Sequence, residues 1–195
     1  ILLGQTFGKY RIESVLGAGG MGIVYRATHL TLERPAAVKV LVPAAGEEGF
    51  DRRFLREAKV LAELKHPNIV DIYDFDVSTW GVPFIVMELL TGLTLRRLAE
   101  TGGGRVEPAL LRLIAEDVAA GLAFAHEKGI VHRDLKPENV FVALYHDRAV
   151  GKVLDFGIAK IVEQGKETSR LTMTGMLVGT PHYLAPEQLL AAPVG

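Results

Sequence analysis

Cysteine is absent from the 195-residue sequence. Its absence excludes disulfide bonds, and it also excludes zinc sites built on thiolate ligands. No apolar run reaches the roughly 20 residues that a membrane-spanning helix needs, and no signal peptide opens the sequence. We expect a cytoplasmic location for this part of the protein, whether or not regions outside the sequence anchor the parent protein to a membrane.

An excess of charge of one sign is absent as well. The 22 basic and 23 acidic residues nearly cancel and leave a formal net charge of −1. Proteins that bind nucleic acids usually carry a basic excess or a basic stripe, so we expect no nucleic-acid partner. Two catalytic patterns are also missing. His126-Glu127 does not extend to H-E-x-x-H because Ile130 occupies the last position, and no G-x-S-x-G run occurs.

Both ends of the sequence lack the usual signs of a terminus. It starts with Ile1 rather than methionine, and it stops within the apolar run "LLAAPVG". We expect the sequence to be a fragment of a longer protein.

Short strands are predicted for the first part of the chain. Apolar-rich runs flank a glycine cluster in "YRIESVLGAGGMGIVYRATHL", which is typical of a hairpin. Further strands are expected in residues 34–42, 68–77 and 83–90. A helix is predicted over residues 47–65, because apolar residues recur there at helical spacing. These residues are Phe50, Phe54, Ala58 and Leu61.

Helices lead the second part of the chain, with loops and short strands after them. A short helix is expected from about Thr94. Pro108 suits the first turn of a long helix, and Gly129 suits its C-terminal cap. Its apolar positions are Leu111, Ile114, Val118, Leu122 and Ala125. The pattern predicts an α+β fold with two lobes joined near residues 88–91.

Gly17, Gly19 and Gly22 form a G-x-G-x-x-G pattern. A dinucleotide-binding fold would need a helix directly after the glycines and an acid about 20 residues on, but a strand-like run follows and Lys39 lies near that distance. A Walker-type phosphate loop is excluded because Ile23 occupies the position of its lysine. Two interpretations remain: a flexible hairpin turn, or a hairpin whose bare backbone closes over phosphates.

Lys39 lies in the otherwise apolar run "AAVKV". Strand alternation places it on the opposite face from Val38 and Val40. A surface position is the commoner explanation of a single lysine in a strand. If its face lines a pocket, however, the ammonium group needs an acid, and Glu57 in the predicted helix is the candidate.

The stretch "IVHRDLKPENVFV", residues 130–142, concentrates charge between two apolar runs. A solvated loop is the usual explanation of such a run. Asp134 and Asn139, however, place a carboxylate and an amide oxygen on one tight loop, and Asp155 in "DFG" adds a second carboxylate. The first acid can orient a hydroxyl group, whereas Asn139 and Asp155 can hold a divalent ion.

Taken in this order, the motifs resemble the eukaryotic-type protein kinases. "GAGGMGIVY", "HPNIVDIYD", "FIVMELLTGLTL" and "GTPHYLAPEQ" are similar to the bacterial serine/threonine protein kinase subgroup. Lys136 and the "GT" at residues 179–180 favour serine and threonine acceptors over tyrosine. The resemblance implies a bilobal protein-kinase fold of the α+β class. Its β-rich N-lobe with one main helix would span residues 1–90, and a mainly helical C-lobe, truncated after "APE", would span residues 91–195.

The resemblance also implies roles for individual residues of the charged loop. Asp134 would orient the acceptor hydroxyl group and take its proton, and Lys136 would neutralise the γ-phosphate. Asn139 and Asp155 would hold the metal ion.

A second group of residues would hold the nucleotide. Lys39 would contact the α- and β-phosphates and pair with Glu57. Met87 would be the gatekeeper residue, and Glu88 and Leu90 would offer backbone groups to adenine. The whole set is Leu16, Gly17, Ala18, Gly19, Gly20, Met21, Gly22, Val24, Ala37, Lys39, Met87, Glu88, Leu90 and Phe141. Leu61, Ile72, His132 and Phe156 are similar to the stacked apolar column of the family.

The implied function is ATP-dependent phosphoryl transfer to serine and threonine hydroxyl groups of proteins, with Mg²⁺ or Mn²⁺ as the metal cofactor. Protein substrates are the expected partners, together with a second copy of the kinase for trans-autophosphorylation. Two alternatives are a nucleotide-binding pseudokinase scaffold and a small-molecule phosphotransferase. Loss of Lys39, Asp134 or Asp155 would favour the scaffold, and absence of the "APE" and "GT-x-x-Y" runs would favour the phosphotransferase. All of these features are present.

Regulation by phosphorylation and an incomplete C-lobe are implied as well. Arg133 can pair with phosphorylated Thr172 and Thr174, which would make the protein a signalling kinase regulated through its activation loop. In the family, Glu187 pairs with an arginine from a later helix that the sequence lacks. We therefore expect the 195-residue chain by itself to be inactive and prone to aggregation.

Overall fold

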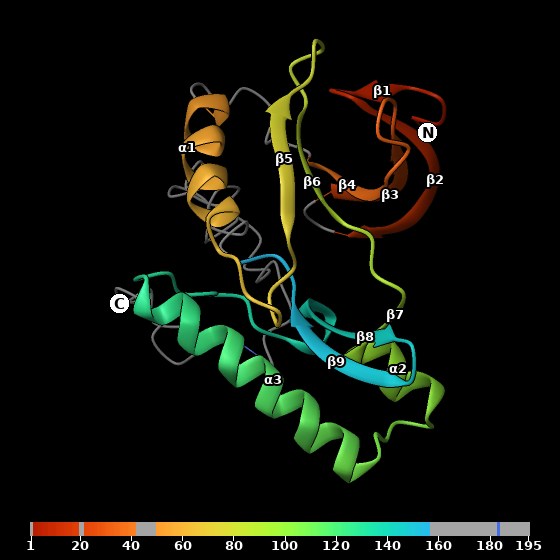
Figure 1. Cartoon of the computed structure of the whole chain (residues 1–195), viewed down its shortest axis with the longest axis vertical. Coiled ribbons are helices and arrows are strands. Elements are labelled where there is room, and N and C mark those ends of the chain that lie inside the picture. Colours follow the sequence, from red (N-terminus) through yellow and green to blue (C-terminus); the bar gives the residue numbers. More distant parts are fainter. Residues whose placement is uncertain (1, 20–21, 42–49, 157–182, 184–195) are drawn as a thin grey trace, which may run out of the picture. The chain divides into compact units, whose positions relative to one another are not determined.

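The computed structural model describes residues 2–19, 22–41, 50–156 and 183 of the chain. The chain divides into two units. Residues 1–66 together with 70–91 form the first, and residues 67–69 together with 92–195 form the second. Figure 1 shows the helices and strands of each unit.

The first unit is built on a six-stranded antiparallel sheet with the strand order β1-β2-β3-β4-β6-β5. Its strands are β1 (Thr6–Phe7), β2 (Tyr10–Gly19), β3 (Gly22–His29), β4 (Pro35–Leu41), β5 (Ile72–Val77) and β6 (Pro83–Glu88). The β2–β3 pair is the hairpin predicted from the apolar runs on either side of the glycine cluster.

One face of this sheet carries the core of the first unit. Residues that alternate along neighbouring strands bury their side chains together, as the period of two requires. The cluster consists of Phe7, Tyr10, Ile12, Tyr25, Ala27, Ala36, Val38, Val40, Phe84 and Val86. Lys39 lies between Val38 and Val40 in β4, so its side chain points to the other face.

Helix α1 (Phe50–Ala62) is the one helix among the described residues of the first unit, and it packs against β5 and β6. The sequence predicted a helix over residues 47–65, and in the described structure it ends at Ala62, three residues earlier than predicted. Phe54, Ala58 and Leu61 are buried on one side of it, and the ring of Phe54 stacks on that of Phe50 at a centroid distance of 6.3 Å. The buried side is the stripe expected from the spacing of three and four residues.

The second unit contains two α-helices and a three-stranded sheet in its described part. These elements are β7 (Gly92–Thr94), α2 (Leu95–Thr101), α3 (Pro108–Glu127), the 3₁₀ turn η1 (Pro137–Asn139), β8 (Val140–Tyr145) and β9 (Arg148–Val153). The strand order is β7-β8-β9. Thr94 caps α2 by accepting a hydrogen bond from the backbone N–H of Arg97 at 3.2 Å. Within the described ranges, none of the helices is long and apolar enough to cross a membrane.

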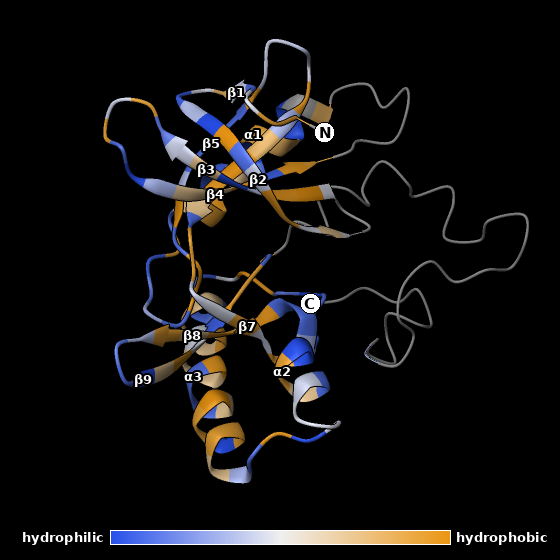
Figure 2. Cartoon of the chain, turned by 90° about the vertical axis from the view of Figure 1, so that its right-hand side faces the viewer, coloured by the Kyte–Doolittle hydropathy of each residue, from blue (hydrophilic) through white to orange (hydrophobic). Residues whose placement is uncertain are grey.

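Helix α3 packs against β9, and apolar residues predominate along it (Figure 2). Pro108 occupies its first turn, and Gly129 follows its end with φ +71°, as predicted. Ile114 and Ala125 are buried, and Ile114 clusters with two valines of β8. The predicted apolar face is only partly buried, however, because Leu111 is 44% exposed.

Residues 67–69 belong to the second unit although they follow α1. Asn68 donates a side-chain hydrogen bond to the Gly151 carbonyl oxygen at 2.9 Å, and its own carbonyl oxygen accepts from Val153 at 2.8 Å. Gly121 makes room for this segment, because a Cβ atom there would lie 2.9 Å from the Asn68 carbonyl oxygen. The segment is therefore held by both β9 and α3.

This close approach predicts that Gly121→Ala destabilises the fold. In a helix interior alanine is normally more stable than glycine by about 1 kcal/mol. At Gly121 the added methyl group meets a backbone carbonyl group, so we expect a loss of about 1–3 kcal/mol in the free energy of unfolding. Denaturant unfolding measures it, with Ala120→Gly at an exposed position of α3 as the control for helix propensity. A Gly121→Ala protein more stable than the wild type would contradict the close packing.

Candidate active site

The β2–β3 hairpin presents bare backbone near its tip. Gly17 pairs with Val24 and Gly19 pairs with Gly22 across the two strands. Gly22 has φ +140°, and a Cβ atom there would lie 2.0 Å from the Val40 carbonyl oxygen, so the fold itself requires this glycine. A Cβ atom at Gly17 or Gly19 would meet nothing within 4 Å in the described structure. The described part of the fold therefore does not require glycine at these two positions.

The predicted nucleotide-binding side chains of β3, β4 and β6 share one face of the sheet. Val24 lies opposite Lys39 across β3 and β4, and Ala37 lies opposite Met87 across β4 and β6. This face is the reverse of the one that carries the apolar core cluster. Lys39 is only 5% exposed, so the surface interpretation of this lysine is wrong. A buried ammonium group must be compensated by polar partners, which favours a functional role.

Glu57, the predicted partner of Lys39, is half-buried on α1. It lies beside the buried Ala58, and its Oε1 atom accepts a hydrogen bond from Arg56 at 3.1 Å. The pairing of Glu57 with Lys39 stays a prediction.

Other predicted nucleotide-binding residues lie at the ends of strands. Leu16 is 51% exposed beside Gly17, and Glu88 is the last residue of β6, followed by half-buried Leu90. Phe141 lies in β8 of the second unit, on the opposite face from the buried Val140 and Val142. Two members of the predicted set, Gly20 and Met21, lie outside the described residues.

The charged loop of the second unit gathers its functional groups around Asp134. Lys136 Nζ donates to Asp134 Oδ2 at 2.7 Å. Asn139 Nδ2 donates to the same carboxylate oxygen at 3.1 Å and to the Asp134 carbonyl oxygen at 2.8 Å. Asn139 is 7% exposed and sits in η1, which Pro137 opens. These mutual contacts show that the stretch is an ordered polar cluster, so the interpretation as a merely solvated loop is wrong.

A backbone hydrogen bond brings Asp155 next to this cluster. The N–H of Leu154 donates to the Asn139 carbonyl oxygen at 2.8 Å. Asp155 follows with φ +57°, an unusual conformation for a residue with a side chain. The loop that carries the second carboxylate is therefore fixed to the loop that carries Asp134 and Asn139.

The donor set of Asn139 and Asp155 fits a magnesium ion. Because the Asn139 amide uses its N–H groups toward Asp134, its Oδ1 atom is the group left to act as a ligand. In the described ranges, no cluster of three or more His, Asp or Glu side chains could enclose a metal ion. Magnesium is usually held by one or two carboxylates and completes its shell with waters and substrate phosphates. Two protein oxygens suffice for that arrangement.

His132 contacts both the loop of Asp134 and the loop of Asp155 from a buried position. It is 2% exposed, and its ring packs against that of Phe156 at a centroid distance of 4.8 Å. Its Nδ1 atom accepts from the N–H of Asp134 at 3.3 Å, so the proton lies on Nε2, which donates to the Leu154 carbonyl oxygen at 2.8 Å. Burial lowers the pKa of His132 below its usual range, and the Leu154 carbonyl and nearby carboxylates only partly offset the effect. Neutral imidazole is therefore the form that orders the loop.

This lowered pKa predicts that the fold weakens in mild acid. The unfolded chain takes up a proton on His132 near its ordinary pKa of about 6.5, whereas the folded chain resists protonation at that pH. The contribution to stability is complete above about pH 6.5 and is lost as the pH falls toward the folded-state pKa. Thermal melts between pH 8 and pH 5 should show this slope, and His132→Gln should reduce it. His126→Gln, at an exposed position of α3, is the matched control, and an unchanged slope in His132→Gln would contradict the prediction.

Comparison with known proteins agrees with this geometry. A model of the protein kinase domain matches residues 10–195. The chain belongs to the protein kinase family. The sequence predicted a serine/threonine kinase, and the relatives include serine/threonine-protein kinases, which confirms that prediction. The serine/threonine-protein kinase pkn3 of Myxococcus xanthus is 40% identical over 189 residues, which are 95% of this chain and 34% of that protein.

Further kinases show the same level of similarity. Serine/threonine-protein kinase PrkC of Bacillus subtilis is 40% identical over 96% of this chain and 28% of its own length. The crystal structure of the Mycobacterium tuberculosis PknI kinase domain superimposes with a TM-score of 0.75 at 31% identity, covering all of this chain and 70% of that one. The chain thus spans about a third or less of the curated relatives named here.

The described residues carry only part of the predicted regulatory set. Arg133 is half-buried beside Asp134 and has φ +65°. Thr172, Thr174 and the "APE" run at residues 185–187 lie outside the described residues. Their roles remain predictions.

Proposed function

We propose that this kinase domain transfers the γ-phosphoryl group of ATP to serine and threonine hydroxyl groups of proteins. The observation that carries the proposal is the Asp134 carboxylate, which Lys136 and Asn139 hold at 2.7 and 3.1 Å. The loop of Asp155 is joined to that of Asn139 by a backbone hydrogen bond of 2.8 Å. Membership in the protein kinase family and the similarity to bacterial serine/threonine kinases support it.

In the proposed reaction Asp134 orients the acceptor. Its carboxylate accepts a hydrogen bond from the substrate hydroxyl group, whose oxygen attacks the γ-phosphorus. The bond from this phosphorus to the bridging oxygen of the β-phosphate breaks, ADP leaves, and the hydroxyl proton passes to Asp134. Lys136, 2.7 Å from Asp134, would neutralise the charge of the transferred phosphoryl oxygens. Positioning and charge neutralisation supply most of the rate enhancement in reactions of this kind.

Asn139 and Asp155 would hold the metal ion. Mg²⁺, or Mn²⁺ in its place, neutralises charge on the phosphates when it is bound. The Asn139 amide is oriented for this role by its two hydrogen bonds to Asp134. The chain itself thus sets the direction of the amide oxygen.

The nucleotide would be held by residues of the first unit. Lys39 would contact the α- and β-phosphates, and the bare backbone at Gly17 and Gly19 would lie over them. Val24 and Ala37 would contact the adenine ring, and the backbone groups of residues 88–90 would bind the edge of the ring through hydrogen bonds. The shared sheet face of Val24, Lys39, Ala37 and Met87 supports this assignment.

A transfer assay with [γ-³²P]ATP tests the function. The full-length protein, incubated with a generic protein acceptor and Mg²⁺, should label serine and threonine but not tyrosine, as phosphoamino acid analysis will show. Label on a small molecule only would favour a small-molecule phosphotransferase. Nucleotide binding without any transfer would favour a pseudokinase scaffold.

Autophosphorylation of Thr172 and Thr174 is expected to accompany activity, with a second copy of the kinase as the partner. Each phosphate adds roughly −1.5 to −2 charge, which can pair with Arg133 and order the segment that carries it. Mass spectrometry of active full-length protein should find both threonines modified, and phosphatase treatment should lower activity. Full activity with both threonines unmodified would exclude this form of regulation.

A further inference from the structure

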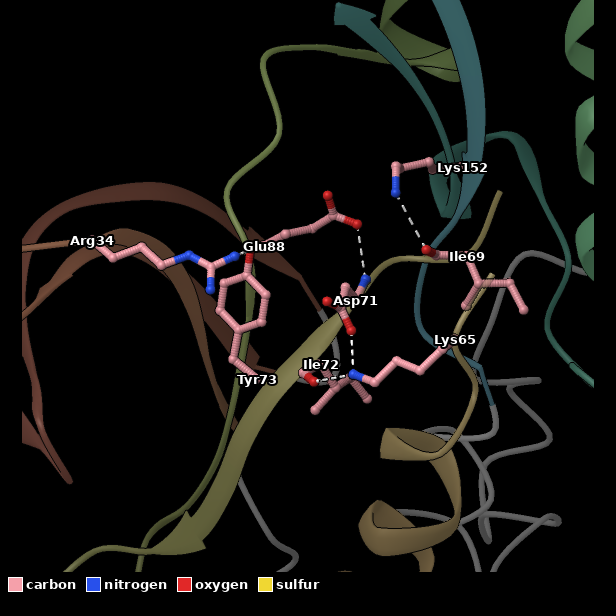
Figure 3. A network of polar contacts seen from close by, with 8 residues as sticks. All are labelled: Arg34, Lys65, Ile69, Asp71, Ile72, Tyr73, Glu88 and Lys152. Carbon is pink, nitrogen blue, oxygen red and sulfur yellow. Dashed lines mark hydrogen bonds and ion pairs between the residues drawn. The ribbon is translucent and has the colours of Figure 1, made fainter. Parts of the chain in front are cut away.

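A continuous set of polar contacts connects the turn after α1 to the end of β6 within the first unit (Figure 3). Its members are Lys65, Asp71, Ile72 and Glu88. Sequence reasoning named two of them, Glu88 for its backbone groups and Ile72 for its apolar side chain. The side chains of Lys65, Asp71 and Glu88 have no part in the chemistry proposed above.

Asp71 and Glu88 hold each other through two reciprocal hydrogen bonds. The N–H of Glu88 donates to the Asp71 carbonyl oxygen at 2.9 Å. In return, the N–H of Asp71 donates to Glu88 Oε1 at 2.8 Å. The last residue of β6 is thus fixed to the residue just before β5 by both its main chain and its side chain. This pairing restricts the backbone at the point where the chain leaves the sheet.

Lys65 holds the Asp71 side of this pair. Its Nζ atom donates to the Asp71 carboxylate and, at 2.9 Å, to the Ile72 carbonyl oxygen. Figure 3 shows the ammonium group between these two acceptors. Lys65 directly follows Leu64, which is 2% exposed and anchors the turn after α1. The contacts therefore run from an anchored turn, through the start of β5, to Glu88.

An aromatic side chain and a second cation border this set of contacts. The Arg34 guanidinium lies 3.8 Å from the centroid of the Tyr73 ring and donates to the Tyr73 hydroxyl group. Burial raises the pKa of Tyr73, the charge of Arg34 lowers it in part, and the carboxylates of Glu88 and Asp71 raise it. Arg34 lies just before β4 and thus adds a positive charge at Tyr73, the ring that the charges of Glu88 and Asp71 also affect.

We propose that Lys65, Asp71 and the side chain of Glu88 are positioning residues for the adenine-reading backbone of residues 88–90. The inference rests on the proposed function, in which that backbone binds the base. Binding groups must be held to within about 0.5 Å of their working geometry, and supporting hydrogen bonds supply that precision. Without the Asp71–Glu88 pairing, the end of β6 loses the hydrogen bond that the Glu88 carboxylate accepts from the Asp71 N–H.

The expected effect is on nucleotide binding rather than on phosphoryl transfer. Groups that contact the base contribute equally in the ground state and the transition state, so their displacement raises KM with little change in kcat. The effect on folding should be small, because the Lys65 and Asp71 side chains are 57% and 43% exposed and exposed ion pairs contribute little to stability. A selective rise in KM therefore distinguishes positioning from a general loss of structure.

The experiment compares four variants of the full-length protein. Glu88→Met removes the oxygen that accepts from the Asp71 N–H, and Glu88→Gln keeps an acceptor there as an amide oxygen. Lys65→Met removes the cation. Lys59→Met is the matched control, an exposed lysine in the last turn of α1 with the same change in charge. Calorimetric titration with Mg²⁺-ADP gives nucleotide affinity, and steady-state kinetics with ATP and GTP give KM and kcat. Thermal melts of each variant check that it remains folded.

We expect Glu88→Met to weaken ADP binding and raise the KM for ATP about tenfold, as for the loss of one hydrogen bond to a charged group. Its kcat should stay within about twofold, its preference for ATP over GTP should fall, and Glu88→Gln should recover most of the affinity. Lys65→Met should show a smaller change in the same direction, and Lys59→Met none. Wild-type binding in both Glu88→Met and Lys65→Met would overturn the inference, as would equal losses for ATP and GTP. Failure of the wild type to bind nucleotide would instead overturn the proposed function.

Discussion

Replacing Asp155 with alanine is expected to lower kcat for phosphoryl transfer by about 100- to 1,000-fold, the usual cost of losing one electrostatic stabiliser of the transition state. The loop itself should keep its fold, because it is held by the Leu154 N–H bond to Asn139 and by His132. Neither contact uses the Asp155 carboxylate. The loss should therefore come from metal-assisted charge neutralisation.

Steady-state kinetics of the full-length protein, with Mg²⁺ titrated in each variant, measure this effect. Asp147→Ala, an exposed acid in the β8–β9 turn, is the matched control. Lys39→Met should fall in the same range as Asp155→Ala through loss of the phosphate contact. Transfer at the wild-type rate in Asp155→Ala, or in excess chelator, would exclude the metal-binding assignment.

Replacing Gly92 with alanine is expected to reduce the free energy of unfolding by about 3 kcal/mol or more. Gly92 has φ +141°, and a Cβ atom there would lie 2.1 Å from the Val142 carbonyl oxygen. Backbone strain of this kind costs about 1–3 kcal/mol, and overpacking against a neighbouring strand costs a similar amount. Because Gly92 begins β7, which pairs with β8, relief of the clash requires the two strands to separate.

Denaturant unfolding measures this loss, and Gly103→Ala provides the control. Gly103 also has a positive φ, +68°, but nothing in the described structure lies within 4 Å of a Cβ atom built there. Gly103→Ala should therefore show the conformational strain alone, with a smaller loss. Equal losses in the two variants would show that the contact with Val142 contributes nothing.

Local patterns in the sequence predicted several features of this protein correctly. The spacing of Phe54, Ala58 and Leu61 predicted α1, because helical periodicity is a property of neighbouring residues. The start of α2 near Thr94 and the cap at Gly129 were predicted for the same reason. The motif of Asp134 and Asn139 lies within six consecutive residues, so its two polar groups are close in any tight loop. Chemistry carried by short motifs is therefore the part that sequence reasoning reaches best.

Contacts between distant residues were beyond sequence reasoning. The sheet order places β6 between β4 and β5, and local propensity does not determine which strands become neighbours. That order sets Ala37 opposite Met87 and buries Lys39, for which a surface position was the commoner expectation. Lys39 lies between Val24 of β3 and Ile85 of β6 in the sheet, a pairing that no local pattern encodes.

The sequence by itself determined the family, the order of the elements and the residues of the charged loop, since each depends on short spacings along the chain. Only the tertiary structure decided that residues 67–69 belong to the second unit and that Gly121 makes room for them. It alone placed the Glu88 side chain on the N–H of Asp71 and Lys65 on the Asp71 carboxylate. These contacts depend on the register between β5 and β6 and on the turn after α1. Both are fixed by packing across the whole unit, because many weak contacts act together there and no single spacing records them.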